Sequence, residues 1–222
     1  MAPSPASDAT FTAARRPAWE LLQRHPREVV GRLGILSSEL EAKIECEGSD
    51  LFAVLAPVWE RGRSVIEALA LGDVGRLEAS ALDLVGLGAG STPAGDDYLV
   101  GAFYALWARS DADWLAGPVE IVAPNTTTPS AAWLRAAARG EASPTWRYLI
   151  EALGVGHSDQ AVRRATLEVL ECGATSGAAS IAGFVDLAEL LFEGGSAQLL
   201  VARRALRRWP PPTRPAGKPE KG

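Results

Sequence analysis

The stretch LVGLGAGSTPAGDDYLVG, residues 84–101, organises the rest of the chain. An apolar run breaks into three alternate glycines and then into a Ser-Thr-Pro triplet. Two adjacent carboxylates, Asp96 and Asp97, then open a second apolar run with the pattern of a helix. Glycine tolerates positive φ and lets the backbone approach another group closely. The stretch therefore predicts a specially shaped loop at the start of a helix.

The start of this helix has the features of an anion site. Thr92 is suited to the N-cap and Pro93 to the first helical position, where a missing N–H costs nothing. Backbone N–H groups at such a start have no partner within the helix and favour an anion. A Walker-type phosphate loop is excluded because no Lys follows the glycines. Asp96 and Asp97 would repel a bare anion unless a positive group lies between them.

Composition limits the class of protein. The 222 residues are 47% hydrophobic, enough to bury a sizeable core. A net charge of −5 and an isoelectric point near 5.2 argue against nucleic acid as the main partner. No apolar run approaches the roughly 20 residues that span a bilayer, so no membrane partner is predicted. We expect a cytoplasmic protein.

The cysteines and the two ends of the chain add little chemistry. Cys46 and Cys172 lie far apart without a C-x-x-C pair, so reduced, partly buried thiols are expected. Residues 1–16 lack the apolar segment of a secretory signal and are expected to be disordered. The same holds for residues 203–222, which are rich in Pro, Arg and Lys. One domain over residues 17–202 remains.

Helical spacing of apolar residues dominates this domain. Helices are predicted over 19–25, 26–33, 37–46, 51–71, 74–85, 97–109, 131–139, 145–153, 159–172 and 178–192, with Asp50, Asp73, Thr128, Ser143 and Ser158 as caps and a kink or break at Pro57 or Gly62. Val119 to Val122 is the single run considered as a strand. The predicted fold class is mainly α, with at most one or two short strands.

The helix over about 97–109 is expected to lie at the centre of a compact multi-helix domain. Its apolar residues are too dense for a surface helix. Gly95 and Gly101 would let neighbouring helices pack close to it.

Two further loops place hydroxyl residues at helix starts, over Asn125–Ser130 and Gly173–Gly177. If all three starts converge, their N–H groups and hydroxyls would form a pocket for a phosphate, carboxylate or carbamoyl group. Ser and Thr are also the commonest N-caps, and simple capping is favoured for these two loops taken alone. The glycine stretch is harder to explain as capping.

Asp96 and Asp97 lie about 100° apart on a helix, so they cannot point the same way. One is expected to bind a cation or orient a substrate amide, and the other to cap its helix or pair with an arginine. Alternatively, both simply complement the helix dipole.

Other polar residues are weaker candidates. His25 and His157 are expected at the surface or behind the site, and no Ser-His-Asp or H-E-x-x-H pattern occurs. Arg135 and Arg139 would reach an anion only by turning away from solvent. Three tryptophans at helical positions are expected in the core or an interface: Trp107, Trp133 and Trp146.

Together with Asn125-Thr126-Thr127 and Thr175-Ser176-Gly177, the stretch GLGAGSTPAGDDYLVG at residues 86–101 resembles the AllH family. This family, formerly a domain of unknown function, is associated with the oxamate carbamoyltransferase of allantoin catabolism, a purine-degradation route. The resemblance covers about residues 82–192. Ala174 and Ala179 stand where the family's third loop has a His and an Asp.

The resemblance implies a subunit of a multi-protein enzyme that moves a carbamoyl group between oxamate and phosphate. Its partners would be a small anionic substrate, such as carbamoyl phosphate or oxamate, and the other transferase subunits. No cofactor is certain, although Mg²⁺ is possible. Asp96 and Asp97 are the expected catalytic residues. The expected substrate-binding residues are Gly88, Gly90, Ser91, Thr92, Gly95, Asn125, Thr126, Thr127, Thr175, Ser176 and Gly177.

Two alternatives stay open at this point. The chain could be a non-catalytic subunit that binds an anion or stabilises partner chains. It could also be a metal-dependent hydrolase that uses the aspartate pair.

Overall fold

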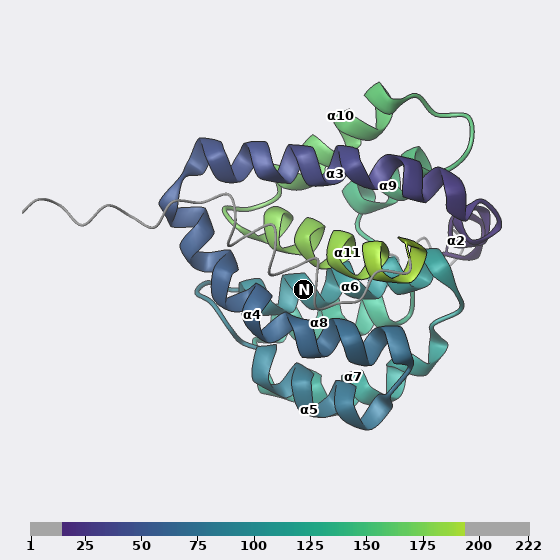
Figure 1. Ribbon diagram of the computed structural model, residues 1–222. Helices are drawn as coiled ribbons and strands as arrows, with labels where there is room; N and C mark the ends of the chain where they lie inside the picture. The colour runs from purple at the N-terminus through teal and green to yellow at the C-terminus, as the bar shows by residue number, and fades with distance from the viewer. Residues whose placement is uncertain (1–14, 194–222) are drawn as a thin grey trace, which may run out of the picture.

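The computed structural model describes residues 15–193, and within this range the chain forms helices and no strand (Figure 1). The mainly α prediction is confirmed. The α-helices are α2 (Arg15–Arg24), α3 (Pro26–Glu47), α4 (Ser49–Leu71), α5 (Val74–Leu84), α6 (Ala94–Arg109), α7 (Ala116–Val122), α8 (Thr128–Ala138), α9 (Pro144–Leu153), α10 (Asp159–Leu170) and α11 (Ser176–Glu193). Short 3₁₀ turns, η1 (Asp113–Leu115) and η2 (Ala123–Asn125), flank α7.

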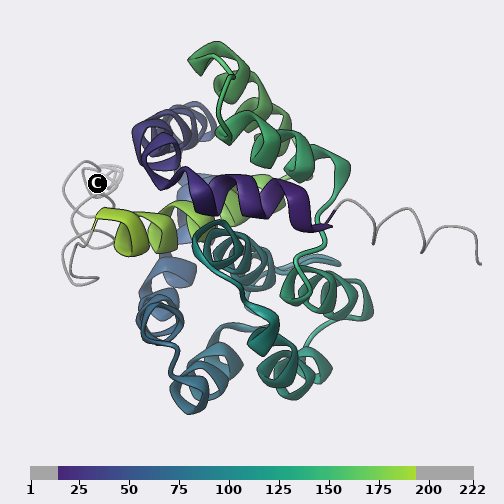
Figure 2. The ribbon, with the colours of Figure 1, turned by 90° about the vertical axis from the view of Figure 1, so that its right-hand side faces the viewer.

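Helix α6 lies at the centre, as its apolar density predicts. All of its residues are buried except Asp97 and Arg109. It contacts α2, α4, α8 and α11, and the other helices surround it in both views (Figures 1 and 2). Polar groups on α6 therefore either find partners inside the protein or face a specific site.

Small residues allow α6 and α11 to cross closely. A Cβ on Gly101 would lie 1.8 Å from the Ser180 carbonyl oxygen, and a Cβ on Gly183 would lie 2.0 Å from the Tyr98 carbonyl oxygen. The backbones touch at both points, which confirms the close packing expected at Gly101. This crossing holds the start of α11 in a fixed position relative to α6.

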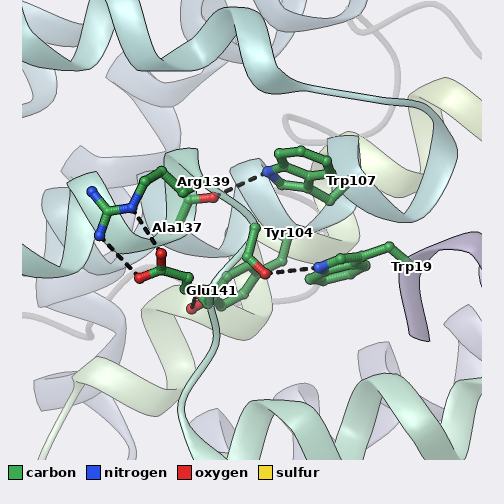
Figure 3. A network of polar contacts seen from close by, with 7 residues as sticks. Trp19, Tyr104, Trp107, Ala137, Arg139 and Glu141 are labelled. Carbon is green, nitrogen blue, oxygen red and sulfur yellow. Dashed lines mark hydrogen bonds and ion pairs between the residues drawn. The ribbon is translucent and has the colours of Figure 1, made fainter. Parts of the chain in front are cut away.

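Helices α6 and α8 lie side by side and point the same way. Near their C-terminal ends, Trp107 donates from Nε1 to the Ala137 carbonyl oxygen at 3.1 Å. The Tyr104 hydroxyl donates to the Glu141 carbonyl oxygen at 3.0 Å, and Trp19 of α2 donates to the Gly140 carbonyl oxygen at 2.8 Å (Figure 3). We call this set of contacts the aromatic end.

The predictions about individual elements have mixed outcomes. Asp73, Ser143 and Ser158 cap their helices as predicted. Helix α3 is continuous instead of two pieces. Helix α4 continues through Pro57, and Gly48, at φ +69°, precedes it in place of an Asp50 cap.

The predicted strand Val119–Val122 is wrong. These residues belong to α7, in which Pro118, Val119 and Val122 are buried together. Their spacing is that of one helical face, which a short apolar run does not distinguish from a strand.

Other surface predictions also needed correction. Cys46 and Cys172 are exposed rather than partly buried, and both are free thiols. Trp107 and Trp146 are buried, whereas Trp133 is 41% exposed.

The segments expected to be disordered, 1–16 and 203–222, lie outside the described residues, apart from Arg15 and Arg16 at the start of α2. In the part of the chain that the structure describes, no helix combines the length and apolar character needed to cross a bilayer.

Candidate functional site

Three loops meet at the N-terminal ends of α6, α8 and α11. They are the glycine loop (residues 85–93), the threonine loop (residues 125–127) and the third loop (residues 171–175). The Thr92 and Ser176 hydroxyl oxygens lie 3.0 Å apart, which joins the glycine loop to the start of α11. The Thr127 hydroxyl donates to the Ser91 carbonyl oxygen, which joins the glycine loop to the threonine loop. We call this place the three-loop junction.

Asp96 braces the base of the junction. Its side chain is 1% exposed and both of its oxygens are occupied. The Gly86 N–H donates to Oδ1 at 2.8 Å, and the Thr126 hydroxyl donates to Oδ2. Asp96 therefore holds the glycine loop against the threonine loop.

Asp97 is in the opposite situation. Its carboxyl faces the hydroxyls of Thr92 and Ser176, yet its Oδ2 is buried with no hydrogen-bond partner among the described residues. Burial raises the pKa of the Asp97 carboxyl to about 7; the Ser176 hydroxyl lowers the pKa, the Asp96 charge raises it and the Thr92 hydroxyl lowers it. A buried polar atom without a partner is costly and calls for an explanation.

The glycine loop has the backbone that its sequence predicts. Gly86, Gly88 and Gly90 have φ values of +75°, +115° and +99°. A Cβ on Gly88 would lie 2.9 Å from the Ala94 nitrogen, so this glycine is also required by packing. Within the described part of the chain, the N–H groups of residues 88–92 donate to no protein acceptor. Successive free N–H groups of this kind can surround an anion.

Three N–H groups at the start of α6 already have acceptors within the protein. The Gly95 N–H donates to the Leu87 carbonyl oxygen at 2.9 Å, and the Asp96 and Asp97 N–H groups donate to the Pro93 carbonyl oxygen. Pro93 occupies the N-cap, and the Thr92 hydroxyl turns to Ser176 instead of capping the helix. The free donors lie in the loop before the helix.

In the threonine loop, the residue that caps α8 lies one position before the predicted one. Thr127, not Thr128, caps α8 by accepting from the Ser130 N–H at 3.3 Å. Asn125 is exposed and donates from Nδ2 to the Ile121 carbonyl oxygen at 3.1 Å, so it closes the end of α7. Ser130, the last residue of the loop Asn125–Ser130 considered from the sequence, is not among the expected substrate-binding residues, yet its buried Oγ has no partner among the described residues. Its place at the end of that hydroxyl-rich loop was the available signal.

Two of the expected binding glycines serve packing. A Cβ on Gly95 would lie 2.1 Å from the Leu84 carbonyl oxygen, and a Cβ on Gly177 would lie 2.0 Å from the Val169 carbonyl oxygen. Thr175 is half-buried, and its carbonyl accepts from the Ala179 N–H in α11. These backbone contacts shape the junction.

The remaining candidates lie elsewhere. His25 and His157 are exposed. Arg135 pairs with Glu120 at 2.9 Å and Arg139 pairs with Glu141 at 2.8 Å, so each arginine faces a glutamate. Over residues 15–193, no group of three or more His, Cys, Asp or Glu residues is placed to hold a metal ion.

A groove of about 860 Å³ lies between α9 and α10. None of its lining residues comes from the glycine loop or the threonine loop, but Glu171 of the third loop is among them. The groove therefore adjoins the third loop.

The comparison with protein families covers this site. Residues 84–187 match the family model described as oxamate carbamoyltransferase subunit AllH. The matched segment starts at the last residue of α5 and ends within α11, so it contains all three loops. No curated protein and no solved structure matches the chain.

Proposed function

We propose that the chain, whose residues 84–187 match the family model described as oxamate carbamoyltransferase subunit AllH, binds a small anionic substrate of the carbamoyl transfer at the three-loop junction. The substrate would be oxamate or carbamoyl phosphate. The other subunits implied by the family name would complete the enzyme.

The observation that carries this proposal is the set of donors around the glycine loop. The N–H groups of residues 88–92 have no protein acceptor among the described residues, and the Thr92 and Ser176 hydroxyls lie beside them. Such donors stabilise a carboxylate or a phosphate, and they suit charge that develops during group transfer.

The two aspartates take different parts in this proposal. Asp97, with its unpartnered oxygen, would contact the substrate. Asp96 would act as a positioning residue, since it holds Gly86 and Thr126 and thereby sets the shape of the glycine loop.

The proposed reaction exchanges one bond to the carbamoyl carbon for another. The C–O bond of carbamoyl phosphate breaks and a C–N bond to the oxamate nitrogen forms. The nitrogen loses a proton and the departing phosphate gains one. The reverse direction releases oxamate and uses phosphate.

Calorimetric titration of the full chain with oxamate, carbamoyl phosphate and phosphate tests the proposal. The double variant Thr92→Val/Ser176→Ala removes both hydroxyls, and we expect about tenfold weaker binding of the anion that the wild type binds. Ser38→Ala is the control, because Ser38 is an exposed serine of α3 whose hydroxyl donates to the Gly34 carbonyl oxygen in its own helix.

If the full chain binds none of the three anions, alone or copurified with its partner subunits, the proposal fails and a purely structural subunit is favoured. If the double variant binds as well as the wild type, the anion site lies elsewhere.

A metal-dependent hydrolase receives no support from the described residues. Over residues 15–193, no group of three or more His, Cys, Asp or Glu residues is placed to hold a metal ion, and each Asp96 oxygen accepts a hydrogen bond from the protein.

A further inference from the structure

Oxamate and carbamoyl phosphate share one feature beyond their charge. Each carries a –C(=O)–NH₂ group, which donates hydrogen bonds, at one end and an anionic group at the other. A site that selects such molecules needs donors for the anionic end and an acceptor for the amide end.

The acceptors contributed to the three-loop junction differ in the partners that they already have. The Thr127 hydroxyl occupies the Ser91 carbonyl, and the Gly86 N–H and Thr126 hydroxyl occupy the two Asp96 oxygens. Two buried side-chain oxygens at the junction have no hydrogen-bond partner among the described residues, Asp97 Oδ2 and Ser130 Oγ, and of these only Asp97 Oδ2 belongs to a carboxylate.

The position of Asp97 places this oxygen next to the donors. Its carboxyl faces the Thr92 and Ser176 hydroxyls, and Thr92 ends the run of free N–H groups in the glycine loop. The junction thus offers N–H donors in the glycine loop and an acceptor without a partner, Asp97 Oδ2, next to Thr92.

We infer that Asp97 determines specificity by accepting an N–H from the amide group of the substrate through Oδ2, while the loop N–H groups bind the anionic end. This inference rests on the proposed function. It explains why the chain keeps a carboxylate where burial penalises its charge, since the substrate would supply the missing donor.

Ligand pairs that differ by NH₂ against CH₃ test the inference. Oxamate and pyruvate form one pair, and carbamoyl phosphate and acetyl phosphate form the other; within each pair, size and charge match. A hydrogen bond to a charged acceptor predicts that the wild-type full chain prefers the amide-bearing member by about 10- to 100-fold in calorimetric Kd.

Asp97→Ala should bring the ratio of the two Kd values close to one. Asp96→Asn is the matched control, because loss of its bracing contacts should weaken both members of a pair by a similar factor and preserve the ratio. A merely structural role of Asp97 would behave like Asp96 in this measurement.

The outcomes separate the two proposals. Equal affinity within both pairs for the wild type overturns the role of Asp97 and leaves the anion site standing. A preference that appears only when Mg²⁺ is added also overturns it, because a metal ion would then be the partner of Oδ2. No binding of any of the four ligands, with or without the partner subunits, overturns the proposed function itself.

Discussion

The two ends of the α6–α8 pair differ in how they treat polar groups. At the aromatic end, Tyr104 and Trp107 each donate to a carbonyl at the close of α8. At the three-loop junction, each Asp96 oxygen accepts a hydrogen bond, whereas Asp97 Oδ2 and Ser130 Oγ have no partner among the described residues. At the aromatic end of this helix pair, the side-chain donors therefore have acceptors, whereas at the three-loop junction two buried oxygens have no hydrogen-bond partner among the described residues.

This difference distinguishes the residues that stabilise the fold from the residues that form the candidate site. A satisfied buried polar group stabilises the fold modestly, while an unsatisfied one costs free energy until a ligand completes it. Removing side chains at the aromatic end should therefore only destabilise. Removing the unsatisfied atoms at the junction should stabilise the chain and weaken the site.

The largest expected effect breaks the aromatic end. Trp107→Ala should lower the free energy of unfolding by about 3–5 kcal/mol, since Trp107 is 5% exposed and its removal leaves a cavity and deletes the hydrogen bond to the Ala137 carbonyl, which then keeps the Gly140 N–H. Urea denaturation at pH 7 measures the change. Trp133→Ala, at a tryptophan that is 41% exposed, is the control and should cost much less. A loss below about 1 kcal/mol for Trp107→Ala would contradict the tight packing and hydrogen bonding of the aromatic end.

The second prediction concerns the sign of the Asp97 effect. The folded-state pKa of about 7 lies above the ordinary value near 3.9, so the folded state binds more protons and stability falls as pH rises from about 4 to about 7. Asp97→Asn removes this loss and should raise the free energy of unfolding by about 2–4 kcal/mol at pH 8, with no gain at pH 4.

Denaturation at several pH values checks this prediction. Asp83→Asn, at an exposed aspartate of α5, should show no comparable dependence on pH. Asp96 is the charged neighbour that acts on Asp97, so the double variant Asp96→Asn/Asp97→Asn reports how much it contributes. A destabilised Asp97→Asn at pH 8 would show that the carboxylate has a partner.

A neighbouring substitution sharpens the contrast within the junction. Asp96→Asn should lower the free energy of unfolding by about 2 kcal/mol, because an amide cannot accept from both the Gly86 N–H and the Thr126 hydroxyl with equal strength. The same urea experiment applies. If Asp96→Asn and Asp97→Asn changed the free energy of unfolding with the same sign, the assignment of Asp96 as a positioning residue and Asp97 as a ligand contact would be wrong.

The smallest effects come from single hydroxyls at the two ends. Tyr104→Phe should cost about 1 kcal/mol, since it removes the hydrogen bond to the Glu141 carbonyl oxygen. Ser130→Ala should be neutral or stabilising by up to about 1 kcal/mol, because its buried hydroxyl has no partner among residues 15–193. Thermal denaturation of both variants beside the wild type resolves the difference in sign. A clear loss for Ser130→Ala would reveal a hydrogen bond at that hydroxyl.

Much of the fold can be predicted from short stretches of the sequence. Apolar residues at helical spacing predict nearly all of the helices, and Asp73, Ser143 and Ser158 cap them where their types indicate. The alternate glycines predict their positive φ values, because this preference belongs to the residue itself. The AllH resemblance also follows from residues that can be read in order.

Errors arose where a local rule had a competitor. Thr92 is a good N-cap by type, but Ser176 takes its hydroxyl and Pro93 occupies the cap. Val119 to Val122 has a strand-like composition, yet burial of one helical face decides its conformation.

The arrangement of the candidate site came from the tertiary structure alone. Asp96 meets Thr126 across 30 positions of sequence, and Thr92 meets Ser176 across 84. No local pattern encodes such contacts, because they depend on how α6, α8 and α11 pack. The residue types predict two carboxylates at a helix start; packing alone makes Asp96 the brace and leaves Asp97 with an oxygen to offer.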